Sequence, residues 1–346
     1  MALQQAARSK WLQWEFWPYP VFYLPVYFLV LAHALRLRSL AYFTAVNPGV
    51  PLGGFVSYSK SALLHQLPRE QVPATLCLNE PKTADQILAL MKQHSLQFPV
   101  VLKPDQGERG WKVEKISNTS QLEAYLRRAP WPLLVQQFAE GPEEFGVMYI
   151  RYPGEQNGRI TSLMQRQFLS VTGDGQSTLE ELLRRHERCL HYLPRMLRRH
   201  RSELQQVLPA GERKILEEIG NHNRGTMFLD ISHRISPQLA ATFDRLSAHL
   251  HEWYFGRFDV RAASFQDLEA GRFQVVEVNG VNSEPAHIYD PAMSLWRAYS
   301  HLFQHWTHIY RIARHNRQRG WKPASARFTW LQIRRHLREK KINPNN

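Results

Sequence analysis

Three oxygen-bearing side chains in the last third of the chain have the types and the spacing of a site for a hard divalent cation. Asp259 lies in a short apolar run, and Glu277 and Asn279 lie two positions apart in a second run rich in valine. Both runs are typical of strands, in which alternate side chains share a face. Carboxylate and amide oxygens suit magnesium, which keeps waters and phosphate oxygens as its other ligands. The pattern predicts a magnesium site, and the alternative is an exposed polar strand face.

The register of the two strands decides which side chains meet. We expect a loop centred near Glu269, which places Asp259 across from Asn279 and Arg261 across from Glu277. The alternation of side chains then gives the pair a polar face and a core face. The polar face carries residues 257, 259, 261, 275, 277 and 279, and the core face carries Phe258, Val260, Val276 and Val278.

A lysine and two glycines follow another apolar run, residues 98–103. The run ends at Lys103, and the loop after it contains Gly107 and Gly110. A lysine at a strand end can place its ammonium group on phosphate oxygens, while glycines let backbone N–H groups approach the same phosphates. The loop matches neither GxxxxGK[ST] nor GxGxxG, so a surface hairpin with two turn glycines is the alternative.

The segment after residues 133–138 could bind a nucleoside. An apolar run is followed there by Gly141, Glu143 and Glu144. Backbone groups of an extended linker can read a base, and a carboxylate can accept hydrogen bonds from ribose hydroxyls.

Bulk composition narrows the class of partner. The net charge is +14 and the pI is about 9.9, which favours anionic partners such as nucleotides, acidic substrates or anionic lipid. No recognised nucleic-acid-binding module accompanies the basic segments, so we predict no nucleic-acid partner. Cys77 and Cys189 lie far apart without CxxC spacing, which excludes a disulfide framework and fits the cytoplasm.

The N-terminal segment is rich in aromatic and aliphatic residues but is interrupted by prolines. Pro18, Pro20 and Pro25 leave only residues 26–35 as an uninterrupted apolar run, which is short for a membrane span. A buried or interfacial helix is expected. An aromatic belt keeps peripheral membrane contact as an alternative. The belt consists of Trp11, Trp14, Phe16, Trp17 and Tyr19.

Helical and strand patterns alternate along the rest of the chain, which predicts an α+β protein of two or three lobes. Ser177 is the expected N-cap of one helix, with Glu180 as its capping-box partner. Helices are expected at residues 59–67, 84–94, 120–128, 177–188, 237–255 and 294–315. Strands are expected at residues 98–103, 111–116, 133–138 and 145–152, with one or two more within 159–171, besides the two that carry the carboxylates.

The order of these features resembles the ATP-grasp superfamily, in particular its D-alanine–D-alanine ligase and cyanophycin-synthetase branches. A helix with Lys60 comes first, then Lys103 with its glycine loop, then the linker, and then Asp259 and the Glu-Val-Asn segment. The likeness covers about residues 55–292. It implies an ATP-grasp fold, in which two α+β lobes grip a nucleotide, with an extra apolar N-terminal segment.

The resemblance also implies a division of the chain and a set of cofactors. Residues 1–54 are a segment of unknown role, 55–150 the N-terminal lobe with the ATP-binding subdomain, 151–320 the C-terminal lobe with the metal site, and 321–346 a basic tail. ATP and magnesium are the implied cofactors.

Individual roles are carried over from the same resemblance. Lys60 and Lys103 contact the phosphates, and Gly107 and Gly110 belong to the loop that covers them. Gln136 stands where relatives usually have a glutamate near the adenine amino group, and either Glu143 or Glu144 binds the ribose. Asp259, Glu277 and Asn279 are the magnesium ligands, and Arg257 steadies the reacting acyl group.

The implied activity is an ADP-forming ligation of a small-molecule carboxylate to an amine through an acylphosphate. Two alternatives are a phosphotransferase of the same fold and a membrane-surface nucleotide-binding protein without turnover. The candidates for substrate recognition are Arg151, Arg166, His222, Arg224 and His287, and strand-surface charges or a structural histidine are the alternatives. The sequence identifies neither substrate, the oligomeric state nor the role of residues 1–54.

Overall fold

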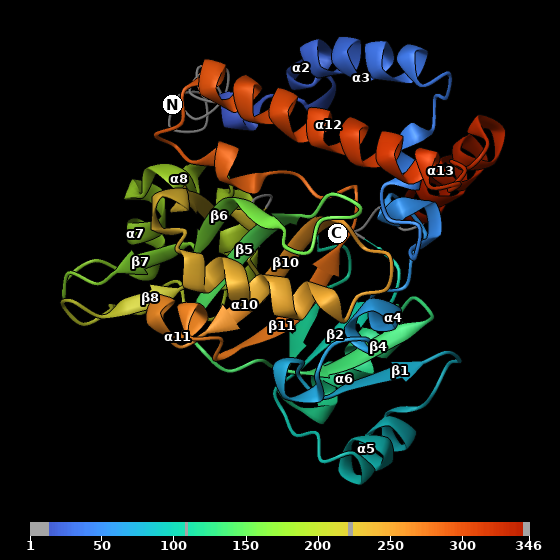
Figure 1. Cartoon of the computed structure of the whole chain (residues 1–346). Helices are drawn as coiled ribbons and strands as arrows, with labels where there is room; N and C mark the ends of the chain where they lie inside the picture. Colours follow the sequence, from blue (N-terminus) through green and yellow to red (C-terminus); the bar gives the residue numbers. More distant parts are fainter. Residues whose placement is uncertain (1–13, 108–109, 221–223, 342–346) are drawn as a thin grey trace.

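Two antiparallel sheets form the centre of the computed structural model, which describes residues 14–107, 110–220 and 224–341 (Figure 1). The four-stranded sheet has the order β1(Thr75–Leu78), β4(Leu133–Gln137), β2(Val100–Pro104), β3(Glu114–Ile116). The five-stranded sheet has the order β11(Phe273–Asn279), β10(Phe255–Ala262), β5(Glu143–Ile150), β6(Arg159–Gln167), β9(Met227–Asp230). The predicted α+β class is confirmed, whereas β1 and β9 were not predicted.

Two helices cover the four-stranded sheet. They are α5(Ala84–Gln93) and α6(Thr119–Leu126), close to the predicted ranges. Thr83 and Gln86 form a capping box that fixes the start of α5. Ile87 and Met91 on α5, together with Leu122 and Tyr125 on α6, are buried against the strands. This core holds β2, the strand that carries Lys103, in place.

The five-stranded sheet is covered on one face by α10(Pro237–Ala248) and α11(Phe265–Glu269). The helix α10 ends at Ala248, so the predicted continuation to residue 255 is wrong. Asn47 gives the physical reason: its Oδ1 accepts from the N–H groups of Tyr254 at 2.8 Å and Phe255 at 3.0 Å. Those N–H groups are therefore satisfied outside a helix, and the chain enters β10 in an extended conformation.

The hairpin β10–β11 has a different register from the one predicted. Asp259 pairs with Glu277, and Arg257 pairs with Asn279. The pairing then shifts, because Val260 pairs with Val275 and leaves Val276 as the extra residue of a β-bulge. The bulge reverses the alternation, so Val275 lies in the core while Val276 lines a cavity. The predicted placement of residues 275 and 276 is therefore wrong.

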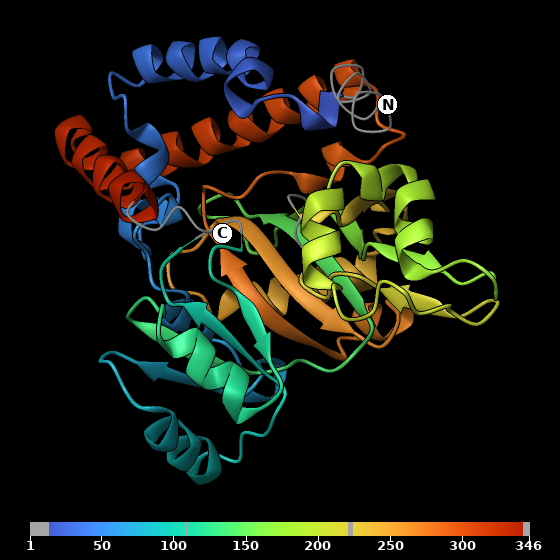
Figure 2. The same ribbon diagram turned by 180° about the vertical axis from the view of Figure 1, so that it is seen from behind.

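A smaller unit with its own core is inserted between β6 and β9 (Figure 2). It contains β7(Ser170–Thr172), β8(Arg213–Ile215), α7(Leu179–Arg185), α8(Glu187–Leu190) and α9(Leu193–Arg199). Thr178 is the N-cap of α7 and Glu181 is its capping-box partner, so the predicted pair of Ser177 and Glu180 is wrong by one position. The Ser177 hydroxyl instead donates to Asp174.

A helical layer lies on the opposite side of the five-stranded sheet from α10 (Figures 1 and 2). It contains α2(Tyr19–Phe22), α3(Leu24–Arg36), α12(Leu295–Gln318) and α13(Ala326–Lys341). The helices α3 and α12 pack on each other and share buried apolar residues with β5 and β10. In the part of the chain that the structure describes, no helix combines the length and the apolar character needed to cross a membrane.

Short elements connect these layers. They are α4(Lys60–Leu64) and the 3-10 helices η1(Trp14–Phe16), η2(Tyr42–Ala45), η3(Pro51–Gly54), η4(Arg69–Gln71), η6(Ser232–Arg234) and η7(Ala286–Tyr289). Gly54 and Gly280 lie so close that a Cβ on Gly54 would come within 2.6 Å of the Gly280 Cα. The N-terminal segment therefore packs directly on the turn that follows Asn279.

Candidate active site

One cavity of about 520 Å³ lies where the two sheets approach each other, and it contains most of the predicted site residues. The four-stranded sheet contributes Val101, Lys103 and Gln136, and α4 contributes Lys60. The five-stranded sheet contributes Glu144, Arg166, Arg257, Asp259, Glu277 and Asn279. Side chains that are far apart in the sequence, such as Lys60 and Asn279, thus line one cavity.

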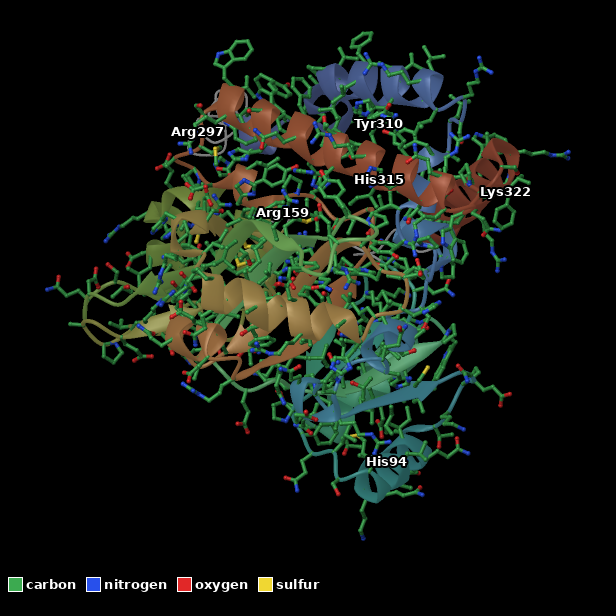
Figure 3. The ribbon with its side chains drawn as sticks, in the orientation of Figure 1. His94, Arg159, Arg297, Tyr310, His315 and Lys322 are labelled. Carbon is green, nitrogen blue, oxygen red and sulfur yellow. The ribbon has the colours of Figure 1, made fainter. Side chains whose placement is uncertain are left out.

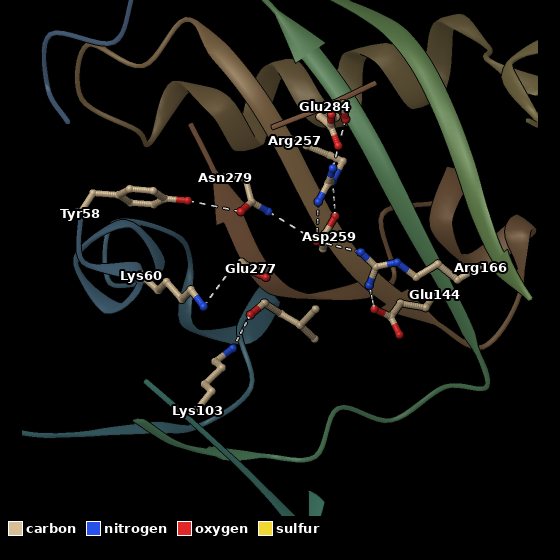
Figure 4. Close-up of polar contacts among 11 residues, drawn as sticks. Tyr58, Lys60, Lys103, Glu144, Arg166, Arg257, Asp259, Glu277, Asn279 and Glu284 are labelled. Atoms are coloured by element: carbon tan, nitrogen blue, oxygen red, sulfur yellow. Dashed lines mark hydrogen bonds and ion pairs between the residues drawn. The ribbon is translucent and has the colours of Figure 1, made fainter. Parts of the chain in front are cut away.

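Lys103 is buried at the junction of the two sheets. Its ammonium group donates to Gln136 Oε1 at 2.8 Å and to the backbone carbonyl of Val276 at 2.9 Å. Figure 4 shows the second of these contacts. The carbonyl belongs to the bulge residue of β11, so the bulge supplies a contact between the sheets. Burial lowers the pKa of Lys103 to about 8, even though Glu277 acts in the opposite direction.

Lys60 lies at the first position of α4 and pairs with Glu277. The distance from Lys60 Nζ to Glu277 Oε1 is 3.3 Å, and the two side chains are 5% and 25% exposed. Ser59 caps the helix, and Asp105 accepts from the backbone N–H of Ser61 at 2.9 Å. Asp105 follows β2 directly, so it joins the helix with Lys60 to the strand with Lys103.

Asp259 is held between two arginines. Arg257 Nε donates to Asp259 Oδ1 at 2.7 Å, and Arg166 Nη2 donates to Asp259 Oδ2 at 2.9 Å (Figure 4). Burial alone would raise the pKa of Asp259, but the two guanidinium groups lower it to about 2. The carboxylate is therefore ionised at any ordinary pH.

Asn279 completes the set of oxygen donors. Its Oδ1 accepts from the Tyr58 hydroxyl at 3.3 Å, and its Nδ2 donates to Asp259 Oδ2 at 3.4 Å. The two partners show which atom of the amide is the oxygen, and this oxygen faces the Tyr58 hydroxyl. Among residues 14–107, 110–220 and 224–341, no group of three or more His, Cys, Asp or Glu side chains could hold a metal ion.

The donor types nevertheless fit a hard cation, because Asp259, Glu277 and Asn279 all line the same cavity. Both oxygens of Asp259 accept from guanidinium groups, whereas the ion pair of Glu277 is with the ammonium group of Lys60. Glu277 and the amide oxygen of Asn279 are therefore the more accessible donors of the three.

The two adjacent glutamates at the start of β5 point in different directions. Glu144 lines the cavity and forms an ion pair with Arg166, whereas Glu143 does not line it. Arg166 thus bridges Glu144 and Asp259, two carboxylates to which the resemblance gives different roles. Of the two candidates for the ribose contact, Glu144 is the one that reaches the cavity.

The glycine loop after β2 is partly described. Gly107 and Gly110 have φ values of 145° and 68°, a region that glycine adopts readily, and Gly110 lines the cavity. Arg224 does not line the cavity but donates to the Gly110 carbonyl at 3.1 Å. Residues 108 and 109 of the loop lie outside the described residues.

The remaining substrate candidates are not brought to the cavity. Arg151 lies over the ring of Tyr254, and His287 is buried against His301. Burial and the neighbouring His301 lower the pKa of His287 to about 4. Both correspond to the structural alternatives stated above, and His222 lies outside the described residues.

Three residues that support the site were not predicted from the sequence. A Cβ on Gly146 of β5 would come within 3.2 Å of Arg257 Cδ and 2.7 Å of Met164 Cε. Thr75 accepts from the Gln136 amide at 3.0 Å, and Tyr58 donates to Asn279. A glycine inside a strand is a known sign of close approach and could have indicated Gly146. The other two have no local signal.

No protein-family model and no curated protein matches this chain. The solved D-alanine–D-alanine ligase of Bacillus anthracis in complex with ATP is 14% identical over 76% of this chain and 68% of that one, with a TM-score of 0.42. The VanG D-Ala:D-Ser ligase of Enterococcus faecalis is 13% identical over 72% and 62%, with a TM-score of 0.37.

A bifunctional glutathione synthetase from Pasteurella multocida is 13% identical over 75% of this chain, with a TM-score of 0.37. This chain spans 38% of the length of that protein. All three structures are similar to this chain at 13–14% identity and with TM-scores below 0.5.

Proposed function

We propose that the protein is an ATP-dependent ligase that joins a carboxylate to an amine, with ADP and phosphate as products. One observation carries the proposal: Lys60, Lys103 and Arg257 line the same cavity as Asp259 and Glu277. Cations from two sheets suit the phosphates of a nucleotide and the charge that develops during phosphoryl and acyl transfer.

The nucleotide would lie between the sheets. Lys60 and Lys103 would contact its phosphates, with the loop at Gly107 and Gly110 over them. The linker residues Gln137, Phe138 and Ala139 line the cavity and would contact the base, and Glu144 would accept from the ribose hydroxyls. The amide oxygen of Gln136 is bonded to Lys103, so we expect Gln136 to orient the lysine rather than to read the base.

Magnesium would be held by Glu277, Asn279 and Asp259, and when bound it would neutralise phosphate charge. The residues themselves supply the remaining steps. Lys60 pairs with Glu277 and would exchange this contact for a phosphate oxygen when the nucleotide enters. Arg257 is fixed by Asp259 and by the Glu284 carbonyl at 3.1 Å, so its guanidinium group is oriented before substrates bind.

The proposed reaction has two steps. A substrate carboxylate oxygen attacks the γ-phosphorus, the bond to the β-phosphate oxygen breaks, and ADP leaves. The amine then attacks the acyl carbonyl, phosphate departs with the bonding electrons, and the amine loses a proton, which gives an amide. Arg257 would stabilise the oxyanion of the tetrahedral intermediate.

ADP release measured against paired panels of amino acids and other carboxylates tests the proposal. Hydroxylamine added to the mixture traps an acylphosphate as a hydroxamate, so both ADP and hydroxamate should appear with the correct carboxylate. ADP with a phosphorylated product and no hydroxamate would favour a phosphotransferase instead. Absence of nucleotide turnover with every pair would favour a nucleotide-binding protein without turnover.

A further inference from the structure

The cavity continues past the charged residues to an aromatic end that the N-terminal segment encloses. Trp14, Trp17, Tyr19 and Phe22 line this end together with Phe228, Ala286 and Tyr289. Trp14 stacks on Phe22 at 5.1 Å and on Tyr289 at 5.9 Å between ring centroids. Residues of unknown role in the sequence therefore form a wall of the same cavity as Lys103 and Asp259.

The N-terminal wall, formed by Trp14, Trp17, Tyr19 and Phe22, is attached to the rest of the chain at two places. The Trp14 ring N–H donates to the Met293 carbonyl at 3.2 Å. Glu15 forms an ion pair with Arg188 of the inserted unit at 3.4 Å, and both side chains are about nine-tenths buried. These contacts connect the wall to the segment that precedes α12 on one side and to α8 on the other.

Glu284 lies at the boundary between the charged end and the aromatic end. The Tyr23 hydroxyl donates to Glu284 Oε1 at 2.5 Å, and the Tyr289 hydroxyl lies 3.5 Å from the same oxygen. The backbone carbonyl of Glu284 accepts from Arg257. Glu284 thus lines the cavity in direct contact with Arg257, the arginine to which the acyl group is assigned.

We propose that the aromatic end is the subsite for the amine substrate and that it takes an amine with an aromatic or bulky apolar group. The Glu284 carboxylate attracts an ammonium group and repels another carboxylate. We therefore assign the aromatic end of the cavity to the amine substrate rather than to the carboxylate substrate. The aromatic rings would bury the apolar group. This inference rests on the proposed ligase function.

Direct binding tests the subsite without turnover. We expect phenethylamine to bind the full-length protein more tightly than ethylamine or phenylacetate in calorimetry with a non-hydrolysable ATP analogue present. Trp14→Ala should weaken phenethylamine at least tenfold, and Glu284→Gln should weaken it while leaving phenylacetate unchanged or tighter. Phe138→Leu, at the nucleotide end, is the matched control and should weaken the ATP analogue instead.

The outcomes separate this inference from the proposed function. Tighter binding of phenylacetate, or equal binding of ethylamine, overturns the amine subsite even if ADP release confirms a ligase. Retained ATP-analogue binding in Trp14→Ala and Glu284→Gln shows that both variants are folded. If no carboxylate supports ADP release or hydroxamate formation, the ligase function fails and the subsite fails with it.

A second, independent observation concerns the outer surface of the helical layer. Large apolar side chains follow α2 and α3 at helical spacing on the side away from the core: Val21, Leu24, Phe28, Leu31 and Leu35. Phe28 and Leu35 are 69% and 68% exposed, while Phe22 and Val26 on the inner side are buried. Trp296 on α12 is 81% exposed, and α13 exposes Phe328, Trp330 and Leu337.

The charges of this layer are almost all positive, because Glu339 in α13 is the single carboxylate residue in the sequences of its four helices. The sequence contains no aspartate or glutamate between residues 16 and 69 or between residues 291 and 338. The first range contains three arginines and the second contains nine, and Arg297 and Lys322 lie near opposite ends of α12 (Figure 3). The net charge of +14 therefore arises largely from the layer that also exposes the apolar stripe.

We infer that this layer docks on an anionic membrane surface, with the stripe of α2 and α3 at the level of the lipid headgroups. Exposed apolar residues with surrounding arginines match the two components of such a surface. Nucleic acid would match the arginines but leave the leucines and Phe28 exposed. The apolar stripe therefore favours the lipid surface.

Sedimentation with vesicles tests the docking surface. We expect the protein to bind vesicles of phosphatidylcholine mixed with phosphatidylglycerol and to bind pure phosphatidylcholine at least tenfold less. Leu24→Ser with Phe28→Ser should abolish binding while the charge is unchanged, and Arg36→Gln with Arg38→Gln should weaken it. Val207→Ser with Ile215→Ser changes exposed apolar residues of the inserted unit and should leave binding unchanged.

Each contrary result overturns the docking surface. Equal binding of the Leu24→Ser, Phe28→Ser variant to mixed vesicles would mean that the stripe does not insert. A dimer seen by light scattering that is lost in this variant, without vesicle binding by the parent protein, would assign the stripe to a second copy of the chain. Binding to duplex DNA but not to mixed vesicles would assign the arginines to nucleic acid.

Discussion

The two ends of the cavity are built by different means. At the charged end, strands hold Lys103 and Asp259, and each of these groups makes at least two polar contacts at 3.0 Å or less. At the aromatic end, short helices of the N-terminal segment supply rings that stack on one another. Electrostatic preorganisation needs a fixed position for each charge, whereas apolar burial depends mainly on the area covered. Under the proposals above, the charged end carries out the chemistry and the aromatic end sets the selectivity.

The largest expected effect comes from Glu277→Gln. The change keeps the shape of the side chain but removes the charge that faces Lys60 and the proposed metal, so we expect ADP release to fall by at least about 10²-fold. Amine binding at the aromatic end should persist. Glu218→Gln is the control. Glu218 lines the same cavity, but its side chain is exposed and pairs with Lys115 instead of Lys60. Full activity of Glu277→Gln would contradict the proposed function.

A smaller loss is expected from Gly146→Ala. The new Cβ would come within 3.2 Å of Arg257 Cδ, so the arginine would have to move away from its position on Asp259. Displacement of an oriented group costs catalysis, and we expect kcat to fall about tenfold with little change in amine binding. Steady-state kinetics measure both quantities. A changed amine affinity with an unchanged kcat would contradict the assignment of catalysis to the charged end and of amine binding to the aromatic end.

The pH dependence of nucleotide binding should follow Lys103. Its ammonium is charged below a pKa of about 8 and neutral above it, so ATP affinity should decrease as the pH rises through 8. Gln136→Glu would place a carboxylate beside Nζ and raise this pKa, which moves the decrease to higher pH. Calorimetric titration of ATP at several pH values tests this. An unchanged midpoint in the variant would show that another group titrates.

The smallest effect is expected from Tyr58→Phe. The change removes the hydroxyl that donates to Asn279 Oδ1, a hydrogen bond of about 1 kcal/mol. We expect a modest increase in the KM for ATP at fixed magnesium and no change in the KM for the amine. Kinetics at several magnesium concentrations would sharpen the assignment, because a loss that excess magnesium restores would indicate that the hydroxyl orients a metal ligand.

Local patterns in the sequence predicted many of the helices and strands but not the contacts between distant segments. The helices near residues 84–94 and 120–128 and the strand that ends in Lys103 lie close to their predicted ranges. The short strand β9 was missed because four residues carry little periodicity. The predicted end of α10 lies too far along the chain. Asn47, about two hundred positions away, accepts hydrogen bonds from the backbone N–H groups of Tyr254 and Phe255, which the sequence pattern could not indicate.

The sequence by itself determined the kinds of donor and their order along the chain, because residue type and strand alternation are local properties. Only the tertiary structure decided the bulge that turns Val276 toward Lys103, the choice of Glu144 over Glu143, and the bridge from Arg166 to Asp259. It also decided that Trp14 and Phe22 belong to the cavity. These features depend on contacts between distant segments, and their energies are absent from any short stretch of sequence.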